Sequence, residues 1–117
     1  MNSGGGSGGS IWINCVYFNG RGHLSTNGGD GNEQGGGGAG GRITVNYQEG
    51  SFHSDQTSAY GGAGGAGGAA GGTWEPGGAG VVYLYGMRPL NKNLRIDNGG
   101  KASHYVSNKR NSTLLHL

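Results

Sequence analysis

The side chains best suited to contact a ligand in this chain of 117 residues are aromatic. Trp12 and Tyr83 occupy equivalent places in two apolar segments, Tyr85 follows closely, and Trp74 interrupts the longest glycine-rich run. Flat aromatic faces on a rigid sheet can stack on sugar rings through their apolar surface. These four residues are therefore candidate ligand-binding residues, with a carbohydrate or another surface ligand as partner. The alternative is that they cover the fold or pack against neighbouring domains.

Residue types that support catalysis or metal binding are present, but their spacing predicts no site. The histidines at positions 23, 53, 104 and 116 have no ligand spacing, and the carboxylates offer no distinct pair for acid–base chemistry. The segment "NGGDGNEQ" departs from the calcium-binding nonapeptide at Glu33 and Gln34. No glycine motif stands between a strand and a helix, as a dinucleotide site requires. We therefore expect no catalytic residue, no metal, no cofactor and no enzymatic activity.

Composition and charge exclude several classes of partner. Of the residues, 31 are glycine and only 12% are charged, with a net charge of +2, so no nucleic-acid-binding surface is predicted. An RNA-binding glycine-rich protein would carry Arg-Gly-Gly repeats, and not one complete copy occurs. No apolar run is long enough to insert into a membrane. Cys15 is the single cysteine, which leaves no disulfide within the chain and favours packing in an apolar segment.

A threefold repeat organises the chain. Each copy has a glycine-rich run, a short apolar strand, a loop and a closing segment that ends in Gly-Gly. The strands are "SIWI" at 10–13, "RITV" at 42–45 and "VVYL" at 81–84, and the closing segments are "STNGG", "SAYGG" and "IDNGG". The last strand residue precedes the Gly-Gly pair by 15, 16 and 15 positions. The copies span about residues 4–34, 35–72 and 77–102, within a repeat region at 1–102.

Stacking the three copies predicts the fold class. Two aliphatic columns result, Ile11 with Ile43 and Val82, and Ile13 with Val45 and Leu84, while Trp12, Thr44 and Tyr83 fall between them and face outward. This is the period of two that strands show. We expect an all-β fold, a parallel β-helix or solenoid of about three coils. The closing segments align less well, because Leu94 and Ile96 stand one position out of step with Leu24 and Thr26.

The glycines have a predicted role in this architecture. Legs that connect stacked strands must approach one another at strand spacing, about 4.8 Å, and only glycine leaves room for that approach. Glycine-rich legs can run in a polyproline-II-like conformation and bond to neighbouring legs. The stretch "GGAGGAGGAAGG" at 61–72 is then a packed leg, the alternative being a mobile loop. Asn27 and Asn98, each before Gly-Gly, predict sharp turns.

A family resemblance follows from these motifs. The segments "GGGSGGSIWI", "STNGGDG" and "GGGGAGGRITV" resemble the glycine-rich repeats of large extracellular β-helical, adhesin-like surface proteins, over about residues 4–100. The resemblance implies a parallel β-helix at the cell surface or outside the cell, with structural or adhesive work. Residues 103–117 depart from it and are expected to form a C-terminal cap or tail. They contain a sequon for N-glycosylation at Asn111, which has meaning only in a secreted eukaryotic protein.

Two further expectations concern alternatives and the ends of the fold. An ice-binding solenoid would present rows of hydroxyl groups, and the outward set of Trp12, Thr44 and Tyr83 argues against it. Only "MNSGGG" precedes the first copy, and no secretory signal is present, so if the protein is exported we expect this chain to be a fragment of a longer one. Because nothing in that segment covers a strand edge, the sequence predicts end-to-end self-association through the N-terminal coil, or contact with neighbouring repeats of a longer chain.

Overall fold

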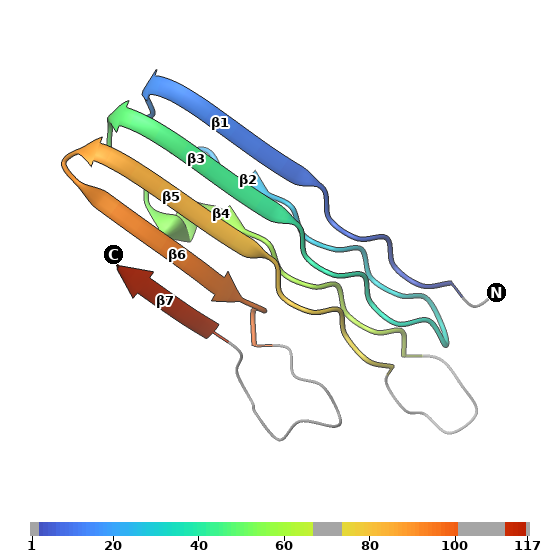
Figure 1. The fold of residues 1–117 in the computed structure, drawn as a ribbon. Helices are drawn as coiled ribbons and strands as arrows, with labels where there is room; N and C mark the ends of the chain where they lie inside the picture. The colour runs from blue at the N-terminus through green and yellow to red at the C-terminus, as the bar shows by residue number, and fades with distance from the viewer. Residues whose placement is uncertain (1–2, 67–73, 101–111, 117) are drawn as a thin grey trace.

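The computed structural model describes residues 3–66, 74–100 and the backbone of 112–116, and it is mostly β, as predicted (Figure 1). One layer is a mixed sheet with the order β1-β3-β5-β6-β7. The second layer is a parallel pair of short strands, β2 and β4, preceded at β4 by a single 3₁₀ turn, η1. The elements are β1 (Ser10–Tyr17), β2 (Leu24–Ser25), β3 (Arg42–Glu49), η1 (Ser54–Gln56), β4 (Thr57–Ser58), β5 (Val81–Arg88), β6 (Asn91–Asp97) and β7 (Ser112–His116).

The strand register confirms the predicted columns. The strands β1, β3 and β5 are parallel, and their pairing aligns Ile11, Ile43 and Val82 in one row and Ile13, Val45 and Leu84 in another. These rows face the second layer, and the row of Trp12, Thr44 and Tyr83 faces outward. Each strand begins at the expected residue but continues for four residues beyond the expected end.

The core lies between the sheet and the second layer. Its buried apolar residues are Ile43, Val45, Tyr47, Phe52, Ala59, Val82 and Leu84. The end of β3 and the loops that follow β1 and β3 supply an aromatic part that the sequence did not predict. In it the ring of Phe18 lies 4.4 Å from that of Phe52 and 5.8 Å from that of Tyr47. Gly86 pairs with Tyr47 across the sheet, and a Cβ there would lie 2.5 Å from the ring. This glycine therefore makes room for the tyrosine.

The third copy departs from the expected repeat. The first two closing segments contribute β2 and β4 to the second layer, with Leu24 opposite Thr57 and Ser25 opposite Ser58. The third closing segment instead forms β6, which pairs antiparallel with β5 in the main sheet. The physical reason is the short connection at Pro89 and Leu90, since two residues can join only antiparallel neighbours. The expectation of three equal closing segments is therefore wrong for the third.

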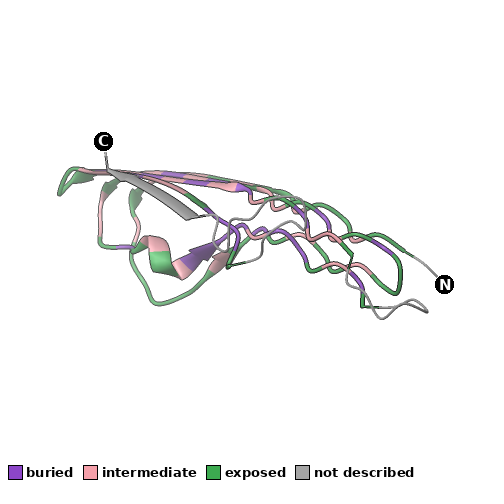
Figure 2. Cartoon of the chain, turned by 90° about the horizontal axis from the view of Figure 1, so that it is seen from below, coloured by how far each residue is buried: buried purple, intermediate pink, exposed green. Residues whose placement is uncertain are grey.

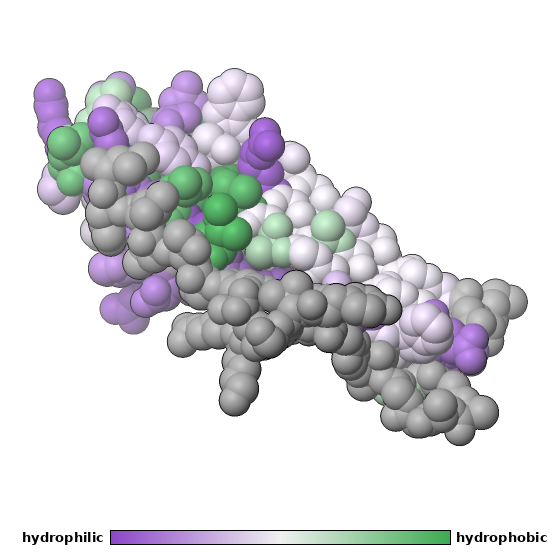
Figure 3. Space-filling view, turned by 60° about the horizontal axis from the view of Figure 1, so that its bottom comes forward, coloured by the Kyte–Doolittle hydropathy of each residue, from purple (hydrophilic) through white to green (hydrophobic). Residues whose placement is uncertain are grey.

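Five glycine-rich segments, here called legs, extend both layers beyond the strands (Figures 1 and 2). Three upper legs, residues 4–9, 35–41 and 74–80, lead into β1, β3 and β5, and two lower legs, residues 26–31 and 59–65, follow β2 and β4. Their backbone N–H groups donate to neighbouring legs at every third residue: Gly37 and Gly40 donate to the third upper leg, and Gly38 and Gly41 donate to the first lower leg. Figure 3 shows the legs as a pale surface beside the more strongly coloured strand half.

Close approach explains most of the glycines of the legs. A Cβ at Gly38 would lie 2.1 Å from the carbonyl oxygen of Gly6, and one at Gly62 would lie 2.0 Å from that of Gly29. Both distances are far below van der Waals contact. The prediction of a packed leg is confirmed for residues 61–66, where Ala63 and Ala66 are the exposed positions. The rest of the stretch, residues 67–72, lies outside the described residues.

The two asparagines before Gly-Gly are followed by different backbone conformations, although the Asn98 side chain, like that of Asn27, accepts a backbone N–H of the second lower leg, from Gly61 at 2.7 Å. Gly99 and Gly100 adopt positive φ of 64° and 83°, which confirms the predicted turn after Asn98. No positive φ occurs at the two glycines after Asn27, and the chain continues there as a lower leg. The Asn27 side chain instead accepts the backbone N–H of Tyr60, at 2.8 Å, so the turn expected there is wrong.

Candidate functional site

The outer face of the main sheet carries three of the four predicted ligand-binding aromatics. Trp12 and Tyr83 stand in one row with Thr44 between them, and Tyr85 stands in the next row. Trp12 is 77% exposed, and Tyr83 and Tyr85 are half-buried. The second layer covers the opposite face of the sheet, as the side view in Figure 2 shows. The three rings therefore face away from the core.

Polar groups lie among these rings. The row of Tyr85 also contains Asn14 and Asn46, whose amides can donate and accept hydrogen bonds. Lys92 on β6 is opposite Tyr85, with its ammonium nitrogen 5.5 Å from the ring centroid, which is cation–π distance. We name this surface the aromatic face, defined by Trp12, Asn14, Thr44, Asn46, Tyr83, Tyr85 and Lys92. It combines flat apolar rings with hydrogen-bonding groups on one sheet.

The structure separates Trp74 from the other aromatics. Trp12 and Tyr83 lie two strands apart, about 9.6 Å at usual strand spacing. Trp74 begins the third upper leg, nine residues before Tyr83, which corresponds to about 28 Å of extended chain. Its backbone N–H donates to the carbonyl of Gly65, and its residue is 45% exposed. Trp74 therefore does not belong to the aromatic face.

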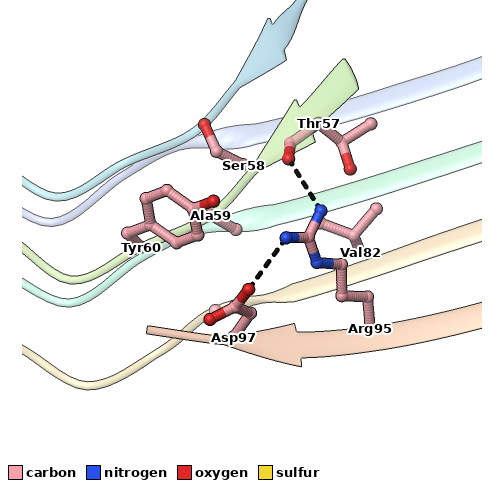
Figure 4. Close-up of a pocket in the computed structure, with 8 residues that line it drawn as sticks. Thr57, Ser58, Ala59, Tyr60, Val82, Arg95 and Asp97 are labelled. Carbon is pink, nitrogen blue, oxygen red and sulfur yellow. Dashed lines mark hydrogen bonds and ion pairs between the residues drawn. The ribbon is translucent and has the colours of Figure 1, made fainter. Parts of the chain in front are cut away.

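A second polar cluster lies beneath the sheet, where β6 approaches β4 (Figure 4). Arg95 points inward from β6, and its guanidinium donates to the Asp97 carboxylate at 2.8 Å and to the carbonyl oxygen of Ser54 at 2.7 Å. The other carboxylate oxygen of Asp97 accepts the N–H of Gly99, at 2.8 Å. Burial opposes the charge of Arg95, but the hydrogen bond to Asp97, with the nearby negative charges, raises the pKa of Arg95 above its ordinary value.

The geometry gives this cluster a structural role. Thr57, Ser58, Ala59 and Tyr60 line the same depression, and they close it so tightly that no space for a water molecule remains. The ion pair lies within β6 and holds the guanidinium in place, and the hydrogen bond from Arg95 to the Ser54 carbonyl ties β6 to the turn before β4. The sequence did not predict it. The sequence feature that could have indicated this cluster is the alternation of Asn93, Arg95 and Asp97, which points polar side chains inward from β6. The same alternation explains why Leu94 and Ile96 are out of step with the other closing segments.

One histidine and one carboxylate, His23 and Asp30, make contacts that join the strands or legs of the second layer. His23 Nε2 lies 3.1 Å from Ser58 Oγ, between the two strands of the second layer. The Asp30 carboxylate accepts the N–H of Ala63, at 2.8 Å, and so joins the two lower legs. Within the described part of the chain, no three His, Cys, Asp or Glu side chains come close enough to hold a metal ion. Over the same residues, no helix has the length and apolar character needed to cross a membrane.

Two sequence-based candidates have other outcomes. Asn111, the predicted glycosylation site, lies outside the described residues. Cys15 is a free cysteine, partly buried, and packs against the core opposite Tyr47. It therefore packs as expected.

Comparison with known proteins adds no relative. No protein-family model matches the sequence, and neither a curated protein nor a solved structure matches the chain.

Proposed function

We propose that this chain is a non-enzymatic structural segment of a cell-surface or extracellular protein, a rigid slab of stacked repeats. The observation that carries the proposal is the network of backbone hydrogen bonds, which links all five legs at every third residue and continues the strand layers. A flexible linker forms no such network. In finer detail, the first two copies are coils of a parallel β-helix, and the legs are polyproline-II helices, which also have three residues per turn and no internal bonds.

The dimensions support a rigid element. The radius of gyration is 16.0 Å and the extents are 55 × 27 × 18 Å. A compact globule of this length would have a radius of about 13 Å and an unfolded chain about 35 Å. The chain is thus an elongated body in which the strands and the legs follow one another along the long axis (Figure 1).

Stretching the protein between two marker domains in a force microscope tests this function. A rigid segment unfolds as one cooperative unit, with a distinct rupture peak whose contour length matches the folded residues. Gly77→Ala, which places a Cβ 1.9 Å from the Gly38 carbonyl oxygen, should lower the rupture force, and Gly78→Ala, in open space, should not. A chain that extends as an entropic spring without a peak refutes the structural role.

A second candidate function is adhesion to carbohydrate through the aromatic face. Support comes from the two adjacent rows, which put the rings of Trp12, Tyr83 and Tyr85 beside the amides of Asn14 and Asn46. Sugars present apolar ring faces and hydroxyl edges, and this surface offers partners for both. The ice-binding alternative lacks such support, because the row of Trp12 contains a single threonine.

Titration of oligosaccharides with tryptophan fluorescence tests the adhesive role. Trp12→Ala should abolish the response and Trp74→Ala should leave it, since Trp74 lies far from the aromatic face. Because Trp12 is 77% exposed, its replacement should change the free energy of unfolding by less than about 0.5 kcal/mol. A response that survives Trp12→Ala and disappears with Trp74→Ala excludes the aromatic face.

A further inference from the structure

The side of the molecule formed by β1 and the first upper leg is an unfinished layer. Within the described chain, β1 pairs only with β3, so alternate residues of β1 direct their N–H and C=O groups outward along a straight edge of eight residues. The inward columns also end there. Ile11 and Ile13 are only partly buried, whereas Ile43 and Val45 next to them are completely buried. Both the hydrogen-bond ladder and the core are open on this side.

The glycines of the first leg match a neighbour that the described chain does not supply. Gly41 and Gly80 occupy equivalent positions of the second and third legs, where a Cβ would lie 1.9 and 2.0 Å from the carbonyl oxygen of the preceding leg. Gly38 and Gly77 show the same contact one turn earlier, at 2.1 and 1.9 Å. The corresponding residues of the first leg are Gly6 and Gly9, and a Cβ on either would meet nothing within 4 Å.

Glycine is not simply the default residue of a leg. Gly8 and Gly40 face the carbonyl oxygens of the lower legs, at 2.0 and 1.9 Å from a Cβ, and the equivalent third-leg residue is Ala79. Gly5 and Gly37 also face carbonyl oxygens of the lower legs, and the equivalent residue of the third leg is Pro76. Because β6 returns into the sheet, the described residues contain no third lower leg to crowd these positions. At these two positions the third leg carries no glycine because no lower leg crowds it, whereas the first leg keeps glycine at Gly6 and Gly9, the positions that face a preceding leg in the other copies.

We propose that the β1 side is a docking surface for one further leg-and-strand unit of the same design, lying parallel to residues 4–17. In the two existing contacts, the preceding leg donates N–H groups to the next one, from Gly5 to Gly36 and from Gly37 to Glu75, both at 2.9 Å. By the same pattern, the docked unit donates to the carbonyl oxygens of Gly4 and Ser7, and its own carbonyl oxygens lie against Gly6 and Gly9. Its strand extends the sheet beyond β1 and covers Ile11 and Ile13.

The occupant is another repeat because the surface continues a contact that the chain already makes twice. This inference rests on the proposed function, in that it supplies the direction in which a structural slab grows. It can fail separately, since a single chain can be rigid without accepting a further unit.

The test uses a dye-labelled peptide with the sequence of residues 35–49, "GGGGAGGRITVNYQE", and the full chain. Fluorescence anisotropy should show saturable binding to the wild type. Binding should weaken at least tenfold with Gly6→Ala plus Gly9→Ala, whose Cβ atoms occupy the space of the peptide carbonyls. Gly78→Ala, an exposed leg position with nothing within 4 Å of its Cβ, should bind like the wild type.

A second peptide keeps the test independent of the folding of any variant. Replacing Gly37 and Gly40 of the peptide by proline removes the two N–H donors and should abolish binding to the wild-type chain. The circular dichroism and melting temperature of the Gly6→Ala, Gly9→Ala chain should equal those of the wild type. Absence of peptide binding to the wild type, or equal binding to the alanine variant or by the proline peptide, overturns the proposal. The pulling experiment on the single chain is unaffected by either result.

Discussion

Two adjacent glycines of the third leg, Gly77 and Gly78, should respond oppositely to replacement by alanine. A Cβ at Gly77 would lie 1.9 Å from the carbonyl oxygen of Gly38 and 2.3 Å from its carbon, whereas one at Gly78 would have nothing within 4 Å. Neither glycine has positive φ, so alanine is compatible with the backbone at both. Comparing the two variants therefore separates the effect of close approach between legs from the other effects of replacing a glycine.

The expected size follows from the bonds near the clash. Contacts of a real Cβ begin at about 3.0 Å, so Gly77→Ala must move the legs apart by about 1 Å. That shift breaks the bonds from Gly77 to Gly62 and from Gly40 to Gly78, both 2.9 Å long. At about 1–3 kcal/mol for each buried group left without a partner, the cost is about 2–6 kcal/mol. Gly78→Ala should instead stabilise by about 0.4–1 kcal/mol, because it restricts the unfolded chain.

Urea denaturation followed by circular dichroism measures both variants. A domain of this size has about 5–15 kcal/mol of stability, so Gly77→Ala should lower the midpoint strongly or leave the chain largely unfolded. Amide exchange should show the loss first in the legs. If the two variants unfold within about 0.5 kcal/mol of each other, the legs are not packed as described, and the explanation of the glycines is wrong.

Three further changes have defined outcomes. Gly86→Ala puts a Cβ 2.5 Å from the Tyr47 ring and should cost about 1–3 kcal/mol in urea denaturation, a loss that the double variant Gly86→Ala, Tyr47→Leu should reduce. Arg95→Met leaves the Asp97 carboxylate buried without its partner and should cost about 2 kcal/mol, less than for a fully buried pair because the Arg95 side chain is 18% exposed. Since its folded pKa is raised, the stability due to charged Arg95 is fully present below the unfolded pKa and disappears only as the pH rises through the still higher folded pKa. The stability difference between wild type and Arg95→Met should therefore stay constant from neutral to mildly alkaline pH, and a fall in that range would contradict the assignment. Asn27→Ala removes the acceptor of the Tyr60 N–H, which should cost about 1 kcal/mol and speed exchange of that amide, while Asn27→Asp should preserve both.

The sequence predicted the strands and their register because period and spacing are local properties. Ile11, Ile43 and Val82 could be aligned by equal distance from the small residues before them. The same reasoning explained most of the glycines, since a leg has no room for a Cβ at the positions that face a neighbouring leg. The strand ends were underestimated because Asn14, Asn46 and Tyr85 alternate with core residues without looking apolar.

The third copy could not be predicted from the repeat alone. Its direction depends on the two-residue connection at Pro89 and Leu90, which outweighs the similarity of "IDNGG" to the earlier closing segments. The contact between Arg95 and the Ser54 carbonyl arises only after β6 has turned back. Of the candidate site, the row of Trp12 and Tyr83 followed from strand period, whereas the distance of Trp74 depends on the length of the leg.

The three-residue period of the legs sets a unit of length for this architecture. In the second lower leg, each Gly-Gly-Ala triplet places two glycines against neighbouring legs and one alanine in solvent. Adding one triplet to each of the facing legs would lengthen the slab by about 9 Å and bring every existing group back into the same lateral position. Insertion of one or two residues would rotate an alanine into the space of a carbonyl. Such a slab can therefore evolve in length by whole triplets, while its width grows by whole copies.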